Sequence, residues 1–504
     1  MMFFVVPGER RGRAVASVVK YVILGAFLAL MIVVGYLSGR KVKNADDYIL
    51  GGRRMGPWLS SMAYGTTYFS AVVFVGYAGR FGWSYGISAT WIGIGNALIG
   101  SLLAWLLLSE RTRRVSQAMQ TSTMADFFNK RYDSPGLEKF AAVIIFIFLI
   151  PYSASVYQGL GYILSGFFKN TFFSDIRWSM LLMALVTAAY LYFGGVLSTA
   201  INSVIQGGIM FFVVIYMVAK VISLLGGLPS AIQGLAAISN ESLPAGVLAS
   251  VGGPAPFDLV VIVLMTSLGT LGLPQMIAKF NSVRDRKATY RATIISTVFA
   301  LVIGGGAYFM GGFARVFNAR MQLGFNDTNL DKLMPVIFEA ILTEEAMAVL
   351  VILMLSASMS TLAAVVMVSA PTFAKSILKR NSMPVMRLLS LLFVLVSYLV
   401  AVIPSAIVTL MSFSWGAVSG AFIGPYIWGL FMKKMTKAGA AAGMICGLGI
   451  VVIGGAVVLS CHLSTALWAP RLAVLAIAAS LLITPLASLA TARVSSIPEG
   501  VKYL

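Results

Sequence analysis

LMLSASMSTLAAV, residues Leu353–Val365, is an apolar stretch that carries an unusual number of hydroxyl groups. In a helix, Ala357, Ser360 and Thr361 lie at positions i, i+3 and i+4, so one backbone carbonyl and two hydroxyl oxygens face the same neighbour. A cation that loses its water inside a bilayer needs such oxygens, and neutral ones suffice when a partner segment offers free carbonyls. Small hydroxylated residues also let two membrane helices pack closely and bond to each other. The stretch alone leaves both interpretations open.

The composition is that of a membrane protein. The chain has 504 residues, of which 59% are hydrophobic and 11% charged. Its mean hydropathy of +0.91 is far above the range of soluble proteins. We therefore expect an all-α polytopic membrane protein embedded in a lipid bilayer. The formal charge of +20 does not indicate a nucleic-acid partner, because so few charges in so apolar a chain are typical of cytoplasmic loops.

About thirteen apolar runs are long enough to cross a bilayer as helices. They lie at about residues 21–38, 57–79, 82–108, 139–168, 178–193, 197–225, 257–278, 292–314, 345–374, 387–403, 405–432, 438–460 and 472–491. The basic residues 1–20 are expected to be disordered. The first run is expected to stay as an extra transmembrane helix, because no small-residue cleavage pattern follows it.

The basic residues of the loops indicate the orientation of the chain. An odd number of crossings places the two termini on opposite sides of the membrane. If the C-terminus is cytoplasmic, most loop lysines and arginines are cytoplasmic too, as the positive-inside rule requires. Four basic residues disagree because they precede the first run: Arg10, Arg11, Arg13 and Lys20. The basic residues in the later cytoplasmic loops are more numerous than these four. We therefore expect a multi-pass plasma-membrane protein with its N-terminus outside and its C-terminus in the cytoplasm.

Two of the runs are poor continuous helices. MAYGTTYFSA (residues 62–71) and TSLGTLGLPQ (residues 266–275) place Gly, Thr and Pro near the middle of the membrane, and Gly and Pro both weaken the helical hydrogen-bond ladder. Carbonyls freed within a bilayer persist only where they line a cavity or bind something. Interruptions at matching places in two halves of a chain are typical of inverted-repeat transporters with a site at the membrane midplane.

The two interruptions are separated by four other runs, which divides the chain into repeats of five helices. The predicted repeats cover residues 57–225 and 257–432, with the helix at 21–38 before them and two additional helices at 438–491 after them. The runs hold almost no Asp or Glu apart from edge residues such as Asp258. Because a proton relay normally needs a carboxylate or His inside the membrane, the sequence favours a metal cation over a proton as the coupled ion.

Five stretches carry a resemblance to the sodium:solute symporter family, and the resemblance extends over roughly residues 40–490. They are GPWLSSMAYGTTYFSA from Gly56, TSTMADFFNKRY from Thr121, YFGGVLSTAINSVIQGG from Tyr192, SASMSTLAA from Ser356 and GLPQMIAKF from Gly272. Each stretch alone is weak evidence for the family, but the order and spacing of all five are specific to it. The resemblance implies a five-plus-five inverted-repeat core of the leucine-transporter type.

The resemblance also implies a sodium site. Its ligands would be the residues that match the family's positions: Thr66, Phe69, Ala357, Ser360 and Thr361. The spacing argument above independently selects the last three. Many relatives have an Asp where this chain has Ser203, and some use that acid for a second ion or on the ion's exit path. We therefore expect one Na⁺ in this protein.

The solute site is less well marked in the sequence. The family's positions match Val73, Ser267 and Thr270, and our own interpretation adds Tyr152 and Gln158 on the run at 139–168. The alternative for the last two is that they only bond to adjacent helices or belong to the interfacial aromatic belt.

The function predicted from these residues is Na⁺-coupled symport of a small organic solute, such as an amino acid or a carboxylate, by alternating access. A proton-coupled permease or an exchanger of the same fold is the alternative. A receptor or a membrane-embedded enzyme is less favoured, because the sequence shows no paired carboxylates, His cluster or nucleophile arrangement. The sequence gives no indication of the oligomeric state.

Overall fold

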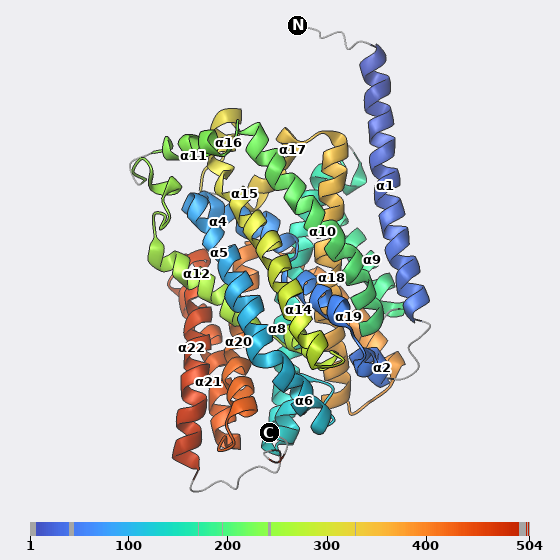
Figure 1. Ribbon diagram of the computed structural model, residues 1–504, viewed down its shortest axis with the longest axis vertical. Helices are drawn as coiled ribbons and strands as arrows, with labels where there is room; N and C mark the ends of the chain where they lie inside the picture. The colour runs from blue at the N-terminus through green and yellow to red at the C-terminus, as the bar shows by residue number, and fades with distance from the viewer. Residues whose placement is uncertain are drawn as a thin grey trace.

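The structure is almost entirely helical. The computed structural model describes residues 7–39, 45–169, 171–193, 195–239, 243–327, 329–492, 500 and 502. Within them the one β feature is an isolated bridge between Met55 and Val283. Long helices run along the long axis of the molecule, and short helices lie across its two ends (Figure 1).

Ten long helices form the body of the described chain. They are α1 (Pro7–Gly39), α8 (Pro135–Phe167), α9 (Ile176–Phe193), α10 (Val196–Leu224), α14 (Arg286–Ala300), α18 (Glu344–Ser376), α19 (Met383–Val402), α20 (Ile407–Phe431), α21 (Lys437–Ser460) and α22 (Thr465–Thr491). Short helices α11 (Leu228–Ala236), α16 (Ala314–Met321) and α17 (Leu333–Ile341) lie at one end, called the outer end below. At the other end lie α2 (Ala45–Leu50), α6 (Glu110–Ala118) and α7 (Met124–Tyr132) (Figure 1).

Two spans are interrupted, as the sequence predicts. The first consists of α3 (Pro57–Tyr68), a π-helical segment (Val72–Tyr77) and α4 (Ala78–Tyr85). The second consists of α12 (Pro256–Leu268), a 3₁₀ turn (Gly269–Gly272) and α13 (Pro274–Asn281), and it bends by 47°. Both breaks coincide with the Gly, Thr and Pro stretches noted above.

Nine helices of the described chain are long and apolar enough to cross a membrane, or ten if the bent pair α12 and α13 is one span. One of the nine covers Val72–Ala118 and includes α5 (Thr90–Gly95). It contains parts of two predicted spans, 57–79 and 82–108. The chain turns inside the second of these, at Gly86, whose φ is +61°. The apolar parts of α1 and α9, Tyr21–Leu37 and Ile176–Ala189, are shorter. The all-helical membrane class is confirmed, and the count of thirteen stays a prediction.

Helix α1 begins earlier than predicted. Its backbone is helical from Pro7, whereas residues 1–20 were expected to be disordered; residues 1–6 lie outside the described part of the chain. From residue 13 to residue 20 the basic segment contains Arg, Ala, Val, Ser and Lys, and neither Gly nor Pro. Because Arg, Lys and Ala favour helix, the segment extends the apolar helix that follows.

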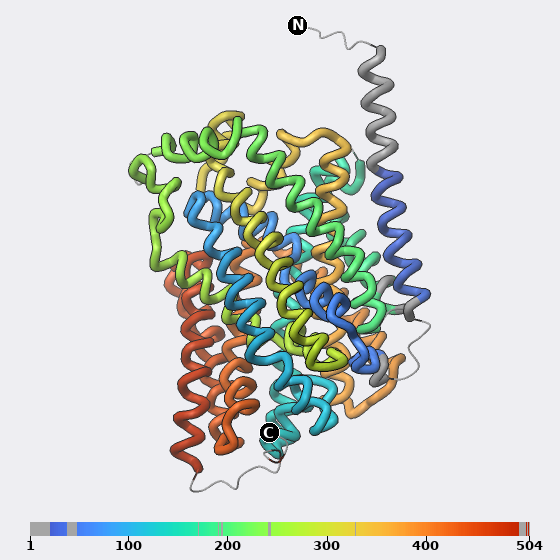
Figure 2. The backbone as a smooth tube through the Cα atoms, viewed as in Figure 1, coloured from blue at the N-terminus to red at the C-terminus, as the bar shows by residue number. Residues whose placement is uncertain are grey.

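Helix α18 is the central element. Thr343 caps its first turn by accepting a hydrogen bond from the Ala346 N–H, and Glu344 and Glu345 complement the positive end of the helix dipole. Its most apolar part is 89% buried, against 28% for α21. The helix packs against α8, α10, α19, α1 and α3 (Figure 2). The hydroxyl-rich stretch Leu353–Val365 is therefore held inside the protein and not against lipid.

Close helix packing in the core depends on a few glycines. Where α4 crosses α15 (Gly306–Gly312), a Cβ on Gly82 would lie 2.0 Å from the Gly311 carbonyl oxygen, and a Cβ on Gly311 would lie 2.1 Å from the Ala78 carbonyl oxygen. The two backbones therefore touch directly, which ties the outer half of the first broken span to the predicted second repeat.

We expect Gly311→Ala to force α4 and α15 apart and to lower the stability by about 1–3 kcal/mol, as overpacking does. The measurement is the melting temperature of the full chain in detergent. The control is Gly305→Ala, where the nearest atom to an added Cβ is Leu301 Cδ1 at 4.0 Å. Equal melting temperatures of the two variants would contradict the packing argument.

Candidate cation and solute sites

The first broken span opens at Phe69. Helix α3 ends at Tyr68, and Phe69 is extended, with φ −110° and ψ 124°. The last four carbonyls of a helix have no intrahelical partner. Here these carbonyls include those of Thr66 and Thr67, in residues that are essentially buried. They therefore need partners from another element.

Helix α18 supplies those partners. Ser360 Oγ lies 2.7 Å from the Thr66 carbonyl oxygen, and Thr361 Oγ1 lies 3.3 Å from the same atom and 3.1 Å from the Thr67 carbonyl oxygen. Both hydroxyl oxygens also lie 3.0 Å from the Ala357 carbonyl oxygen. We call these three carbonyl and two hydroxyl oxygens the oxygen cluster.

The structure brings together four of the five residues predicted to hold Na⁺. Phe69, the fifth, lies at the break itself, with its ring stacked on Tyr68 at 4.6 Å. Thr67 was missed by the sequence analysis. Its carbonyl could have been found from the general rule that all four final carbonyls of a broken helix are free.

The oxygen cluster has more acceptors than donors. Two hydroxyl hydrogens serve the two freed carbonyls of Thr66 and Thr67, whereas the Ala357 carbonyl already belongs to the hydrogen-bond ladder of α18. A carbonyl or hydroxyl oxygen has two lone pairs, so acceptor capacity remains after these bonds are made. The C-terminal end of α3 adds partial negative charge. Uncharged carbonyl and hydroxyl oxygens are the ligands that replace the water of a monovalent cation within a membrane. The donor set therefore fits Na⁺, and among the described residues no group of three or more His, Cys, Asp or Glu could hold a metal instead.

Helix α18 also binds the other side of the break. The Ala71 N–H donates to Ser358 Oγ at 3.0 Å, so the chain is held by α18 both before and after its extended residue. The adjacent Val72 N–H donates to Ser70 Oγ at 3.3 Å. These contacts satisfy backbone groups that the missing helical turn leaves free.

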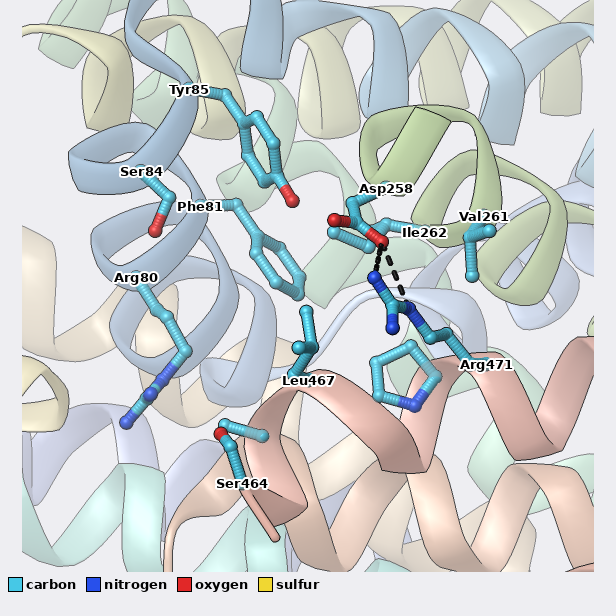
Figure 3. A pocket seen from close by; sticks show the side chains of 12 residues that line it. Arg80, Phe81, Ser84, Tyr85, Asp258, Val261, Ile262, Ser464, Leu467 and Arg471 are labelled. Atoms are coloured by element: carbon cyan, nitrogen blue, oxygen red, sulfur yellow. Dashed lines mark hydrogen bonds and ion pairs between the residues drawn. The ribbon is translucent and has the colours of Figure 1, made fainter. Parts of the chain in front are cut away.

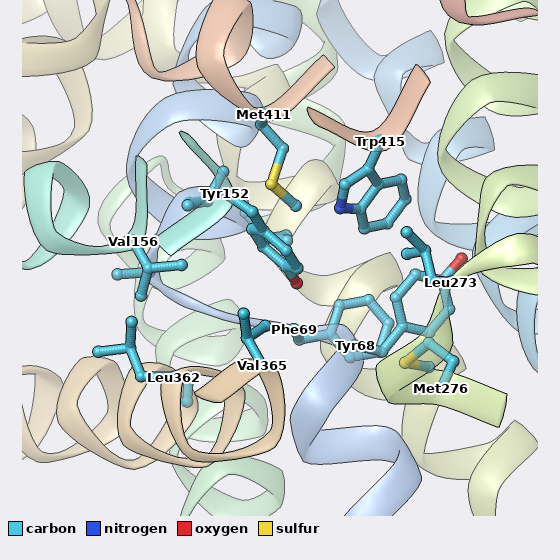
Figure 4. Close-up of a cluster of buried hydrophobic side chains, with 14 of the residues drawn as sticks. Tyr68, Phe69, Tyr152, Val156, Leu273, Met276, Leu362, Val365, Met411 and Trp415 are labelled. Carbon is cyan, nitrogen blue, oxygen red and sulfur yellow. The ribbon is translucent and has the colours of Figure 1, made fainter. Parts of the chain in front are cut away.

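The two broken spans face each other. The Tyr68 hydroxyl donates to the Thr266 carbonyl oxygen at 2.8 Å, which joins the end of α3 to α12. Around this contact the rings of Tyr68, Phe69, Tyr152 and Trp415 form a buried layer, with Met411 beside it (Figure 4). Tyr68 lies 6.3 Å from Trp415 and Tyr152 lies 6.1 Å from it, measured between ring centroids. We call these four rings the aromatic layer.

The predicted solute residues have different surroundings. Tyr152 belongs to the aromatic layer, and Val73 is buried beyond the break. Ser267 Oγ donates to Asn96 Oδ1 at 3.2 Å, and Thr270 Oγ1 lies 3.2 Å from the Gly100 carbonyl oxygen. The last two hydroxyls thus contact the adjacent span.

Gln158 lies away from the other predicted solute residues, toward the outer end. It is six residues further along α8 than Tyr152, about 9 Å along the axis of the helix. Its Nε2 donates to the carbonyl oxygen of Ala401 at 3.1 Å and to Ser405 Oγ at 3.1 Å. The side-chain nitrogen of Gln158 therefore bonds to a neighbouring helix and the link after it, as the alternative interpretation of the sequence has it.

Charged residues cluster at the outer end, beside the second broken span. Arg471 on α22 donates from Nη2 and Nε to Asp258 Oδ1 at 2.7 and 3.0 Å. The pair lines a pocket of about 180 Å³ that Arg80 and Tyr85 also line (Figure 3). Asp258, an edge residue in the sequence, thus fixes the start of α12 to α22.

A multi-pass helical bundle with two opened helices, and with uncharged oxygens gathered at one of the openings, is the architecture typical of secondary transporters. Residues 48–447 match the sodium:solute symporter family, and the chain belongs to that family. The family resemblance found in the sequence is thereby confirmed.

Relatives align over most of their length. The chain is 26% identical to the sodium/proline symporter of Escherichia coli K12 over 441 residues, which cover 84% of this chain and 85% of the relative. It is 26% identical to the osmoregulated proline transporter OpuE of Bacillus subtilis over 445 residues, 85% of this chain and 87% of the relative. Among solved structures, a Na⁺-coupled sialic acid symporter in a substrate-bound, outward-open state superposes with a TM-score of 0.70 at 16% identity, covering 93% of this chain and 98% of that one. That likeness supports the fold.

We expect Ser358→Ala to lower the stability by about 1–3 kcal/mol, because it leaves the buried Ala71 N–H without a partner. Thermal unfolding of the full chain measures the loss. Ser369→Ala is the matched control, since that buried hydroxyl donates to the Val365 carbonyl oxygen of its own helix, which is already within the helical ladder. Equal melting temperatures for Ser358→Ala and Ser369→Ala would refute the role given to the Ser358–Ala71 hydrogen bond.

Proposed function

We propose that this protein couples the entry of one Na⁺ to the entry of a small organic solute. The observation that carries the proposal is the pairing of the Ser360 and Thr361 hydroxyls with carbonyls freed at the break of α3. Membership of the sodium:solute symporter family supports Na⁺ as the ion. The relatives named above are proline and sialic acid symporters, which supports a solute with a carboxylate group.

The ion would be held by the carbonyls of Thr66, Phe69 and Ala357 and by the two hydroxyls of α18. Because these ligands come from α3 and α18, the ion stabilises the arrangement in which the two helices are joined. A ligand shifts a conformational equilibrium only by its differential affinity for the two states. With the interior negative by 100 mV, each inward Na⁺ also supplies about 2.3 kcal/mol.

A single ion is consistent with the surroundings of Ser203. This residue stands where many relatives have an acid, and its Oγ donates to the Thr199 carbonyl oxygen of its own helix at 2.8 Å. A neutral hydroxyl brings no negative charge, so it attracts a second cation less strongly than an acid at this position would. We therefore propose one Na⁺ per transport cycle.

The solute would bind at the breaks. Val73 and Tyr152 would contact its apolar part, and the hydroxyls of Ser267 and Thr270 would bind its polar groups through the lone pairs that they do not use at present. Entry requires the aromatic layer to open, since its four rings are buried in this conformation. Transport by alternating access then has two steps: Na⁺ enters from outside and completes the solute site, and it later leaves toward the cytoplasm.

The proposed membrane orientation rests on charge. The end of the molecule with α2, α6 and α7 (Figure 1) carries many lysines and arginines in or beside its short helices. They include Arg53 just after α2, Arg114 on α6, Lys130 on α7 and Lys375 in the last turn of α18. The positive-inside rule places such an end in the cytoplasm. The outer end, with α11, α16 and α17, would then face outward across the plasma membrane.

The sodium site is tested without knowledge of the solute. We expect NaCl, but not KCl or choline chloride at equal ionic strength, to raise the melting temperature of the purified chain. At a Na⁺ concentration 100 times the dissociation constant, the folded state should gain about 2.7 kcal/mol of stability. Ser360→Ala and Thr361→Ala should require at least 10-fold more Na⁺, while Ser369→Ala should respond as the wild type does. Stabilisation that follows pH and ignores Na⁺ would instead support the proton-coupled alternative.

The orientation is tested with a native cysteine. Cys461 is exposed just beyond the outer end of α21, and Cys446 is partly buried within that helix. A membrane-impermeant maleimide should label the chain in intact cells, and Cys461→Ser should abolish the labelling while Cys446→Ser should not. Labelling that appears only after the cells are broken would reverse the proposed orientation.

A further inference from the structure

A polar pocket of about 410 Å³ lies at the end of the molecule with α2, α6 and α7, called the inner end below. It is formed between the first turns of α14 and the segment that leads into α6, which pack against each other (Figure 1). Its lining includes Arg114 and Arg286, one from each side, together with Trp105, Glu110 and Tyr290. We call it the inner pocket. None of these residues belongs to the oxygen cluster or to the aromatic layer.

The inner pocket carries positive charge that its own acid does not balance. Arg113 binds both oxygens of Glu110, with Nη2 2.8 Å from Oε1 and Nε 3.0 Å from Oε2. Arg114 Nε lies 3.6 Å from the same Oε1, beyond hydrogen-bond distance. Arg286 has no ion pair with any residue that the structure describes. Two guanidinium groups at one pocket therefore keep donors for an anion.

The face of α14 beside the pocket changes from basic to apolar along the helix. Arg286, Tyr290, Ile294 and Val298 lie four residues apart, so they share one side of the helix, and all four are exposed. Across the pocket Leu106 is exposed as well. In a protein that spans a bilayer, exposed aliphatic side chains contact the acyl chains, and a Tyr beside them lies at the level of the headgroups. The inner pocket therefore lies where headgroups and acyl chains meet.

Trp105 connects the inner pocket to the two broken spans. Its side chain is 1% exposed, and its indole N–H has no hydrogen-bond partner among the described residues. Its ring lies 5.5 Å from that of Tyr64 on α3 and 4.9 Å from that of Phe280 on α13, measured between centroids. A ligand of the inner pocket therefore contacts a residue that packs against the inner halves of both broken spans.

We propose that the inner pocket binds the headgroup of an anionic phospholipid, whose phosphate pairs with Arg114 and Arg286. Basic pockets between transmembrane helices bind such headgroups, and a guanidinium can give two parallel hydrogen bonds to one phosphate. The acyl chains lie along Leu106 and Ile294. A free phosphate compound shares the chemistry of the headgroup, but the exposed apolar face beside the pocket favours a lipid. The proposal does not depend on which ion or solute the protein carries.

The test measures the melting temperature of the purified full chain in detergent while lipid is added. The probes are dioleoylphosphatidylglycerol, which is anionic, and dioleoylphosphatidylcholine, which has no net charge. We expect phosphatidylglycerol alone to raise the melting temperature, with saturation. Arg114→Gln and Arg286→Gln should each raise the half-saturating concentration about 5-fold, which is the effect of one basic residue near an anionic surface.

The matched control is Lys287→Gln, which removes the same charge from an exposed neighbouring position that does not line the pocket. It should keep the half-saturating concentration of the wild type. The proposal is overturned if the two lipids stabilise the wild type equally, or if Arg286→Gln and Lys287→Gln give the same half-saturating concentration.

Two further measurements exclude other occupants of the inner pocket. sn-Glycerol 3-phosphate carries the phosphate without acyl chains, and we expect no stabilisation from it at the concentrations that suffice for the lipid. Equal stabilisation by this compound would assign the pocket to a free phosphate. The alternative for the exposed face of α14 is a second copy of the chain. A dimer that forms without phosphatidylglycerol and dissociates in Tyr290→Ala, measured by light scattering, would overturn the lipid assignment.

Discussion

The structure depends on the contact between the freed carbonyls of α3 and the hydroxyls of α18. Within a bilayer an unpaired carbonyl costs several kcal/mol, so a helix can open at Phe69 only if another element supplies donors. Ser360 and Thr361 supply one hydrogen for each of the freed carbonyls of Thr66 and Thr67, and each of these oxygens keeps a further lone pair. The same contact that makes the break tolerable therefore leaves a surplus of lone pairs in a buried place. A monovalent cation is the species that removes such a surplus without requiring any further donor.

One helix, α18, contacts the chain on both sides of the break, so an ion bound at the proposed site would act on a contact that several helices share. Ser360 and Thr361 bind the chain before Phe69, and Ser358 binds it at Ala71. Helix α18 is also the most completely buried span, with a capped start and contacts to α1, α3, α8, α10 and α19. Any shift of α3 relative to α18 therefore disturbs the packing of several neighbouring helices. Such packing favours two discrete arrangements of the helices over a continuous range of positions.

The parts of the site that were predicted from the sequence are those set by local geometry. The spacing of Ala357, Ser360 and Thr361 puts their oxygens on one face of any helix, and the Gly, Thr and Pro stretches weaken any helix in which they lie. The surroundings of Gln158 could not be predicted in this way, because its partners Ala401 and Ser405 lie 243 and 247 residues away along the chain. The aromatic layer was missed for the same reason: Tyr68, Tyr152 and Trp415 come from α3, α8 and α20, and no periodic pattern links them.

The aromatic layer and the pair of Arg80 and Asp331 differ in what holds them together. The aromatic layer contains no ion pair, and its rings come from three helices, so it opens only when those helices move relative to one another. Arg80 and Asp331, 3.9 Å apart, lie instead at the edge of a polar cavity of about 380 Å³. Asp331 is buried, so the attraction between the two charges is screened less than that of a surface ion pair. The arrangement of the aromatic layer therefore depends on how three helices pack, whereas the Arg80–Asp331 contact depends on the charges of two side chains.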